Sequence, residues 1–519
     1  MSKIAKTTIA LMIITILSKV LGFGREIMLG SVYGATQYAD VYLVALEIPA
    51  IIIASIATAI STTYIPLFYD IKEECGEERA MKFTNNLVNI VAIICIIFVL
   101  LGLIFTKPLV KIIAFGFEGE TLQLAVKFTR VLLLATLFIG IGYITTSYLQ
   151  IKDNFTIPGL IGLPYNIIII ISIYLSVKYN IYILAWGTLI AYASQLIIQL
   201  PYAKKNGFKY KLELNLKDKY LKEMIIIVTP IFIGVAVNQI NALIDKSLAS
   251  TLAEGSIAAL NYANKLNWFI ITIFIASISS VIYPKIAELA TKDKKEQLLD
   301  TITTCVNTVV LLVVPISVGA IILANPIVKI LFQRGEFDER AVKMTSIALV
   351  FYSLGMLAFG LRDVLSRAFY ALKDTKTPMI NGSLAMILNI LLNIMLIRFM
   401  GHGGLALATS ISSTVTVILL FISLKRKIDG FDMSKIINTL LKVIVTSLIM
   451  GLVTHISYII LKNRLGEQFI YDIVNLVISV IIGAITYAII IINMKIDEVN
   501  LVIGRMNSLL YKFKLKKKK

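Results

Sequence analysis

Long apolar runs, separated by short polar connections, follow one another along almost the whole chain. Most of these runs hold roughly 20 mostly apolar residues, the length of an α-helix that crosses a bilayer. The pattern predicts an all-α polytopic membrane protein with about 14 transmembrane helices. We place them at residues 7–24, 39–69, 85–106, 128–150, 157–177, 181–202, 221–250, 257–284, 300–323, 343–372, 377–398, 403–424, 436–461 and 469–493.

The composition agrees with this pattern. Of the 519 residues, 58% are hydrophobic and 16% are charged, whereas about a quarter of the residues in soluble domains are charged. The first apolar run follows Lys3 and Lys6 but lacks the small residues of a cleavage site, so we expect a retained helix rather than a signal peptide. The three cysteines have no disulfide or zinc spacing and are expected to serve in packing.

Basic residues are unequally divided between alternate connections. The set that includes both termini holds 31 Lys and Arg residues, and the other set holds 13. An even number of spans places both termini on one side, and the positive-inside rule makes that side the cytoplasm. Most of the formal charge of +19 therefore lies there. We expect the basic tail to be attracted to anionic lipid and not to nucleic acid.

The sequence repeats itself at an offset of about 220 residues. The segment "KPLVKIIAFGFEG" from Lys107 corresponds to "NPIVKILFQRGEF" from Asn325. Further on, "TSYLQIKDNFTIP" from Thr146 corresponds to "SRAFYALKDTKTP" from Ser366. Each repeat holds six predicted helices, an even number, so the two repeats have the same orientation in the membrane.

These repeats define three predicted regions. Residues 1–218 form an N-lobe of helices 1–6, residues 219–430 form a C-lobe of helices 7–12, and residues 431–519 add helices 13 and 14 and a basic tail. Transporters built from parallel repeats bind substrate between the two halves. The architecture therefore predicts a central cavity.

Each repeat opens with adjacent opposite charges, at the end of a predicted span in the first repeat and inside one in the second. Arg25 and Glu26 in the first repeat correspond to Asp245 and Lys246 in the second. Ionisable side chains in spans are costly and usually face a cavity or one another. One interpretation is an ion pair within each couple. Because neighbouring residues on a helix do not face each other, we favour exposure of Arg25 to the cavity.

A cationic cavity would suit an anionic ligand. Arg25 and Lys265 are the candidate cations, and the planar fork of arginine makes it the better phosphate ligand. Lys19 can also be explained by snorkelling to the membrane surface. The remaining candidates for cavity or gating roles are Lys19, Asp40, Glu47, Lys246, Arg362 and Arg367.

A second group of polar residues suggests a small cation. Asp245, Asn389, Asn393 and Thr409 could supply oxygen ligands to sodium, which is the one cofactor we consider. Amide pairs in membranes also serve as interhelical hydrogen-bond partners, and both interpretations stay open.

We predict no catalytic residues. The chain has no phosphate-binding G-x-x-x-x-G-K-[ST] motif, and its two histidines, His402 and His455, are isolated in the sequence. A membrane glycosyltransferase or lipid phosphatase would need catalytic carboxylates or a histidine nucleophile. We therefore expect a protein that is not an enzyme.

Several segments resemble the MurJ (MviN) family of lipid II flippases, which belongs to the multidrug/oligosaccharidyl-lipid/polysaccharide exporter superfamily. They are "SKVLGFGREIMLGSVYGA" from Ser18, "LNYANKL" from Leu260 and "RAFYALKDTKTP" from Arg367. The resemblance covers essentially the whole chain. It implies a bacterial plasma-membrane carrier that moves the undecaprenyl-pyrophosphate-linked peptidoglycan precursor to the outer leaflet by alternating access. This role in cell-wall biogenesis and cell shape implies membrane lipid and cell-wall synthesis proteins as partners.

The resemblance also implies roles for individual residues. Ser18, Arg25 and Glu26 correspond to the family's helix 1 pattern, and Lys265 corresponds to its helix 8 cation. The sodium ligands of family members would correspond to Asp245, Asn389, Asn393 and Thr409, although Asn393 stands where an aspartate is expected. The segment from Glu47 to Ser55 lacks the cation that the family often has in helix 2.

Other functions remain to be weighed. The chain could export another lipid-linked oligosaccharide of the teichoic acid or capsule type, or exchange drugs and cations as other exporters of the superfamily do. A drug exporter would need acidic groups in its cavity, and Arg25 and Lys265 argue against one. A scaffold without transport activity would not need buried charges in both lobes.

Overall fold

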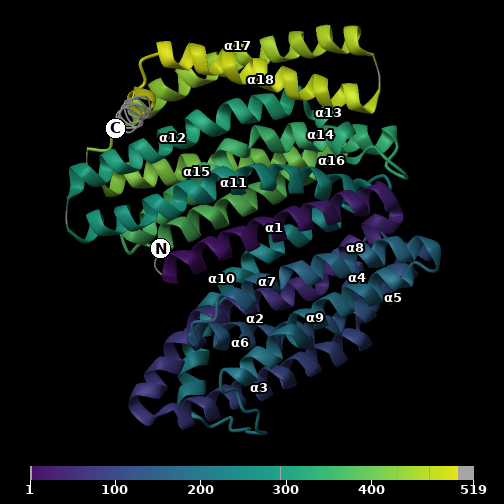
Figure 1. The fold of residues 1–519 in the computed structure, drawn as a ribbon, viewed down its shortest axis with the longest axis vertical. Coiled ribbons are helices and arrows are strands. Elements are labelled where there is room, and N and C mark those ends of the chain that lie inside the picture. The colour runs from purple at the N-terminus through teal and green to yellow at the C-terminus, as the bar shows by residue number, and fades with distance from the viewer. Residues whose placement is uncertain (1–2, 293, 429, 467, 501–519) are drawn as a thin grey trace, which may run out of the picture. The chain divides into compact units, whose positions relative to one another are not determined.

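The computed structural model describes residues 3–292, 294–428, 430–466 and 468–500, and the regular structure in these ranges is helical (Figure 1). The helices are α1 (Lys3–Tyr33), α2 (Gln37–Cys75), α3 (Glu77–Ile104), α4 (Thr106–Ile113), α5 (Gly119–Leu133), α6 (Ala135–Ile151), α7 (Thr156–Leu160), α8 (Gly162–Lys178), α9 (Tyr182–Lys205), α10 (Lys219–Ala249), α11 (Ser256–Thr291), α12 (Lys295–Ile322), α13 (Ala324–Phe332), α14 (Glu339–Leu354), α15 (Met356–Ala371), α16 (Lys376–Lys427), α17 (Met433–Leu465) and α18 (Phe469–Asn493).

The predicted all-α membrane fold is confirmed, and each predicted range falls on helix apart from residues at ends or breaks. Breaks at Leu134, Ile161 and Gly355 divide three of the predicted spans. Conversely, α16 contains two predicted spans, 377–398 and 403–424. The two helical segments meet at a kink at Gly401, where φ is 54°. In the described ranges, eight helical stretches are long and apolar enough to cross a membrane, or nine with the bent pair α14 and α15.

The internal repeat is visible in the backbone. The short helices α4 and α13, both predicted as connections, follow α3 and α12 at the same offset. After α6, Asp153 has a positive φ of 56°, and after α15, Lys373 has a φ of 58°. In both places the next backbone N–H donates to a carbonyl five residues earlier. The two halves therefore fold along the same path, as the sequence repeat predicts.

The chain forms two compact units. Unit 1 comprises the residues up to Ala258 together with Arg334–Asp338, and unit 2 comprises Ala259–Gln333 and the residues from Glu339 onward. Each unit has its own apolar core. In unit 1 the core gathers around Tyr64, Phe68 and Phe83 on α2 and α3. The predicted lobe boundary at residues 218 and 219 follows the repeat and stays a prediction.

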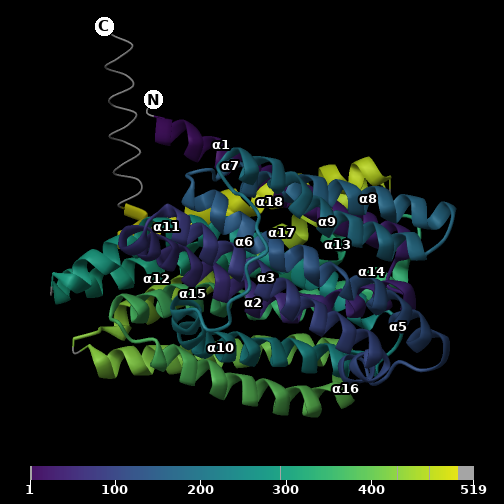
Figure 2. The same cartoon turned by 90° about the horizontal axis from the view of Figure 1, so that it is seen from below.

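The two additional helices belong to unit 2. Helices α17 and α18 lie side by side in Figures 1 and 2, and α17 packs on α12. Lys329 on α13 forms a 3.0 Å ion pair with the buried Asp472 on α18, and the Tyr487 hydroxyl donates to the Leu311 carbonyl at 2.7 Å. The predicted basic tail from residue 501 onward lies outside the described residues.

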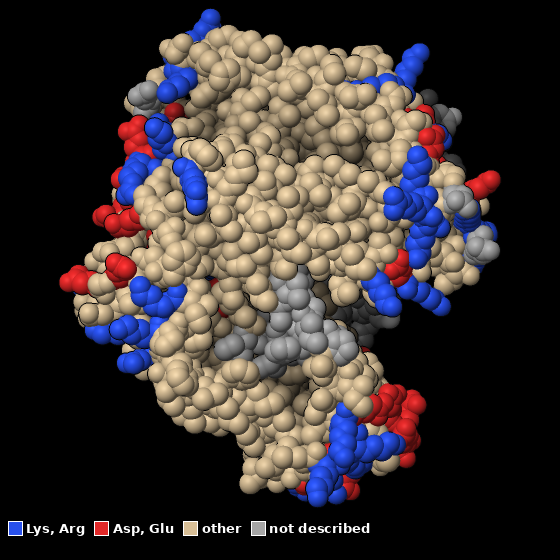
Figure 3. Space-filling model, turned by 180° about the vertical axis from the view of Figure 1, so that it is seen from behind, with Lys and Arg blue, Asp and Glu red and all other residues tan. Residues whose placement is uncertain are grey.

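Charged side chains gather toward the helix ends. On the face drawn in Figure 3, a broad surface of other residues lies between edges that carry Lys, Arg, Asp and Glu. This distribution suits helices whose middle sections face lipid.

The segment "KDTKTP" joins the two ends of α16 through one carboxylate. Asp374 accepts hydrogen bonds from the Thr377 N–H at 3.0 Å and hydroxyl at 2.8 Å, and Lys427 lies 2.7 Å from the same carboxylate. The hydrogen bond from Lys427, followed by that from the Thr377 backbone, lowers the pKa of Asp374 to about 2.

We expect Asp374→Asn to lower the melting temperature by a few degrees at pH 7, because it removes the charge that Lys427 and Thr377 stabilise. A carboxyl with a lowered folded pKa stabilises the fold above its unfolded pKa of about 4, and this contribution is lost as the pH falls through about 2. Melting curves of both proteins in detergent between pH 7 and pH 2 should therefore converge only at the acidic end. A difference that already disappears near pH 5 would contradict this assignment.

Candidate functional site

The Arg25 and Glu26 side chains contact each other. Arg25 Nη2 lies 2.6 Å from Glu26 Oε1, and Glu26 is buried. The expectation that neighbouring residues on a helix would not pair is therefore wrong. That expectation rests on the direction of the Cα–Cβ bonds, whereas the long, flexible arginine side chain can still reach the carboxylate of its neighbour.

Tyrosines from two further helices complete this cluster in unit 1. The Arg25 guanidinium lies over the ring of Tyr165 on α8, 5.6 Å from its centroid. The Tyr165 ring in turn lies 5.0 Å from that of Tyr192 on α9. Stacking on an aromatic ring fixes the plane of the guanidinium. Since Glu26 engages one of five N–H donors, the guanidinium retains further donors for an anion.

Ser18 packs against a neighbouring helix. A Cβ added to Gly162 on α8 would lie 2.2 Å from Ser18 Oγ, and the Ser18 carbonyl accepts a 3.4 Å hydrogen bond from Asn166. This close approach of α1 and α8 needs the glycine. By contrast, Lys19 on the same helix is exposed.

Asp40 caps the start of α11. Its buried carboxylate accepts hydrogen bonds from the Gly255 and Ala258 N–H groups at 2.8 and 2.7 Å. At Gly255, φ is 84°, and an added Cβ would lie 1.9 Å from the Ala35 carbonyl oxygen. The α10–α11 connection is thus held tightly to the start of α2, within unit 1.

Glu47 forms an ion pair with Lys246. Glu47 lies on α2 and Lys246 on α10, and both side chains are about one-fifth exposed. Lys246 also lies 3.5 Å from the Leu43 carbonyl oxygen. Thus the segment that lacks the family's helix 2 cation supplies a carboxylate instead, and that carboxylate neutralises a lysine of another helix.

We expect Glu47→Ala and Lys246→Ala each to lower the melting temperature by several degrees, because each leaves a partly buried charge without its partner, at a cost of roughly 1–3 kcal/mol. The exchanged pair, Glu47→Lys with Lys246→Glu, should recover most of the loss. Thermal unfolding of the parent protein, the two single variants and the exchanged pair in detergent tests this pairing. If the exchange recovers nothing, the pairing is not what stabilises this contact.

The candidate cations of unit 2 lie on α11 and α15. Lys265 and Arg362 are both exposed. Trp268, one turn after Lys265, stacks on Phe359, one turn before Arg362, with ring centroids 6.0 Å apart. Arg367 instead pairs with Asp363 at 3.0 Å on its own helix.

The candidate sodium ligands are divided between the units. Asp245 belongs to unit 1, and the others belong to unit 2. Asn393 donates to Asn389 at 3.1 Å, and Asn389 donates to Ser412 at 3.4 Å. The Thr409 hydroxyl donates to the Leu405 carbonyl. Within unit 2, Asn393 therefore bonds to a residue one turn away on the same helical segment, and Asn389 bonds to the segment of α16 that follows Gly401.

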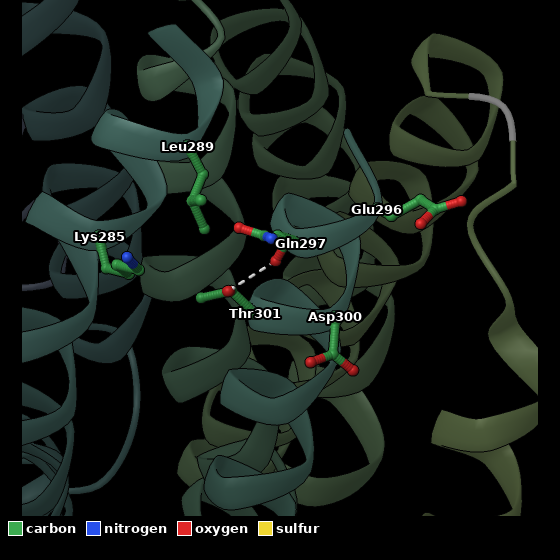
Figure 4. A pocket seen from close by; sticks show the side chains of 6 residues that line it. All are labelled: Lys285, Leu289, Glu296, Gln297, Asp300 and Thr301. Carbon is green, nitrogen blue, oxygen red and sulfur yellow. Dashed lines mark hydrogen bonds between the residues drawn. The ribbon is translucent and has the colours of Figure 1, made fainter. Parts of the chain in front are cut away.

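A surface hollow of about 410 Å³ lies elsewhere in unit 2, between the end of α11 and the start of α12. Its lining residues are Lys285, Leu289, Glu296, Gln297, Asp300 and Thr301. Figure 4 shows that the carboxylates of Glu296 and Asp300 do not converge on Lys285. None of these residues was predicted as part of the site.

Sequence reasoning missed the tyrosines beside Arg25. Tyr165 and Tyr192 come from helices about 140 and 170 residues away in the sequence, so no local pattern connects them with α1. The one signal in the sequence was that both tyrosines lie in predicted spans. A tyrosine inside the membrane needs a polar partner for its hydroxyl, so each could have been named as a candidate neighbour of a charged residue.

Known proteins match nearly the whole length of this chain. The model of the family described as "Lipid II flippase MurJ" matches residues 29–473. A probable lipid II flippase MurJ of Buchnera aphidicola subsp. Acyrthosiphon pisum is 29% identical over 93% of this chain and 96% of its own length. A solved structure of a lipid II flippase MurJ, in an inward closed conformation, matches 93% of this chain and 98% of its own, with 27% identity and a TM-score of 0.80. An inward-facing multidrug transporter of the MATE family, 13% identical with a TM-score of 0.68, shares the fold.

Proposed function

This chain belongs to the lipid II flippase MurJ family, and from that premise we propose that it moves lipid II from the inner to the outer leaflet of the bacterial cytoplasmic membrane. The substrate is the undecaprenyl-pyrophosphate-linked precursor of peptidoglycan, and transport proceeds by alternating access. The observation that carries this proposal is the match over nearly the full length to the solved lipid II flippase. The family is one of transporters, and the proposed cycle needs no covalent step.

The charge distribution supports the proposed orientation. Of the Lys and Arg residues in connections and tails, 31 lie on the side of the termini and 13 on the other side. We therefore propose that both termini are cytoplasmic. Membrane lipid is the other expected partner, and contacts with cell-wall synthesis proteins belong to the same proposal.

Arg25 is the proposed headgroup ligand of unit 1, and Lys265 is that of unit 2. A pyrophosphate carries charge that a planar guanidinium can bind through two parallel hydrogen bonds. The contact with Tyr165 supports this role because it orients the Arg25 guanidinium. Glu26 accepts a hydrogen bond from Arg25 and would compete with the headgroup for its N–H donors. It is therefore the proposed residue for tuning or gating headgroup binding. The positive charge of Arg25 and Lys265 also argues against a drug or cation antiporter as the alternative function.

Complementation tests the function directly. A bacterial strain depleted of its own lipid II flippase should grow when it expresses this chain, and labelled lipid II should become accessible at the outer leaflet. A strain that depends on export of a teichoic or capsular precursor should not be rescued. Rescue of the second strain alone would assign the other oligosaccharide as the substrate.

Sodium coupling is proposed as a property of Asp245, Asn389, Asn393 and Thr409. Oxygen ligands of these types suit a hard cation. In proteoliposomes we expect an imposed sodium gradient to accelerate lipid II transport, and Asp245→Asn to remove this acceleration. Transport that ignores sodium and depends fully on membrane potential would overturn sodium coupling but would leave the flippase assignment intact.

A further inference from the structure

The connection between α9 and α10 is held along α3 by three asparagines. Asn85, Asn86 and Asn89 are all buried, although they lie on one of the most apolar helices of the chain. Asn85 donates to the Lys209 carbonyl at 3.0 Å, and Asn86 exchanges two hydrogen bonds with the Asn215 backbone at 2.9 and 2.7 Å. This arrangement satisfies amides that lipid could not satisfy.

The hydrogen bonds of Asn89 complete a regular pattern. Its amide donates to the carbonyl of Glu213 at 2.8 Å and to that of Lys211 at 3.4 Å. The α3 asparagines thus bind the carbonyls of every second residue between 209 and 215. A period of two is the signature of an extended strand, whose side chains point alternately to opposite faces. The connection therefore lies on α3 as a single extended strand.

This strand is amphipathic. One face carries Leu212, Leu214 and Leu216, and the other carries Lys209, Lys211, Glu213 and Asn215. The hydroxyl of Tyr210 donates to Asn89 Oδ1 at 2.7 Å and so ties the start of the strand to α3. The three leucines are 83%, 56% and 67% exposed, respectively. Three large apolar side chains in register form a continuous apolar edge, which is unfavourable in water.

The charge around the strand indicates what covers this edge. Residues 204–222 contain seven lysines and two acidic residues. One of the acidic residues, Asp218, is buried and already paired with Arg79 at 2.6 Å. The segment also connects two helices, α9 and α10, beside the start of the spanning helix α3 (Figures 1 and 2). Lysines flanking exposed leucines beside a spanning helix match anionic headgroups above acyl chains.

We propose that residues 209–216 form an interfacial strand that docks on a bilayer containing anionic lipid. The leucine face enters the boundary between headgroups and acyl chains, and Lys209, Lys211 and Lys217 contact headgroup phosphates. The α3 asparagines hold the backbone in register, so that the strand needs no neighbouring strand. This assignment depends on the membrane fold and not on the transported substrate.

A fluorescent probe tests the depth of the strand. The full chain carrying Cys75→Ser and Leu214→Cys is labelled with an environment-sensitive dye and placed in lipid nanodiscs. The matched control carries Lys294→Cys, which is exposed in the α11–α12 connection. We expect blue-shifted emission and quenching by lipids spin-labelled near the headgroup for position 214, and water-like emission for position 294. Equal, water-like emission at both positions would overturn the proposal.

A second experiment tests the headgroup charge. Quenching at position 214 should be stronger in nanodiscs with anionic lipid than in those with zwitterionic lipid alone. Lys209→Gln, Lys211→Gln and Lys217→Gln together should remove this difference, since each lysine near a membrane surface contributes about fivefold to the attraction. A label that is shielded only in native membranes, and exposed in nanodiscs of either composition, would identify a protein partner and overturn lipid docking.

Discussion

Arg25→Ala is expected to abolish growth of a flippase-depleted strain while the protein still inserts into the membrane. Arg25 lies beside the buried Glu26 and over Tyr165, so the guanidinium is oriented before any ligand arrives. Loss of a preoriented, charge-assisted contact costs roughly 2–5 kcal/mol of binding free energy, or about 30- to 5,000-fold. Growth, outer-leaflet lipid II and membrane-inserted protein should be measured together.

Two controls separate ligand binding from folding. Arg25→Lys keeps the charge but loses the planar fork, and we expect it to retain partial function. The double variant Arg25→Ala with Glu26→Gln removes the uncompensated carboxylate. It should restore any lost stability without restoring growth.

Normal growth on Arg25→Ala would contradict the headgroup role. Growth restored by the double variant would show that the ion pair serves only the fold. Lys19→Ala provides a matched comparison, because Lys19 is an exposed cation on the same helix. We expect it to grow normally.

Asp40→Ala is expected to prevent accumulation of folded protein. The Asp40 carboxylate accepts the N–H groups of Gly255 and Ala258 in a buried position. Without it, two donors at the start of α11 lose their partners, at a cost of roughly 1–3 kcal/mol each. The negative charge near a helix N-terminus contributes about a further 0.3–1 kcal/mol.

Asp40→Asn should have an intermediate effect, because its single amide oxygen can still accept one hydrogen bond. Gly255→Ala should resemble Asp40→Ala, since its Cβ would collide with the Ala35 carbonyl. Size-exclusion profiles and melting curves in detergent measure these effects. If Asp40→Ala melts within about two degrees of the parent protein, the cap contributes little to stability.

The fold was largely predictable from the sequence because a bilayer imposes long apolar helices. The breaks within spans were not predictable. Apolar residues continue across Leu134 and Ile161, so hydropathy contains no signal there. Likewise, α4 and α13 are too short to span and were predicted as connections, although they fold as helices that follow α3 and α12 at matching places.

The candidate site was less predictable because its contacts depend on side-chain length and on packing between distant helices. The Arg25–Glu26 pair forms through a flexible side chain that a rule about helix faces does not describe. The partner of Lys246 is Glu47, about 200 residues earlier, and not the adjacent Asp245. The strand on α3 did carry a visible signal, the alternation of Leu with polar residues from Lys209 to Leu216, but its lysines were considered only as charge.

The matching backbone turns after α6 and α15 bear on the ancestry of the protein. Aspartate tolerates the left-handed region of φ and lysine is less suited to it, yet Asp153 and Lys373 adopt almost the same angle. Left-handed turns are common at helix ends, and Lys495 after α18 has one as well, so the link between these two turns is their spacing, which equals the offset of the sequence repeat. The simplest origin is duplication of one six-helix segment, after which the side chains diverged and the path of the backbone was kept.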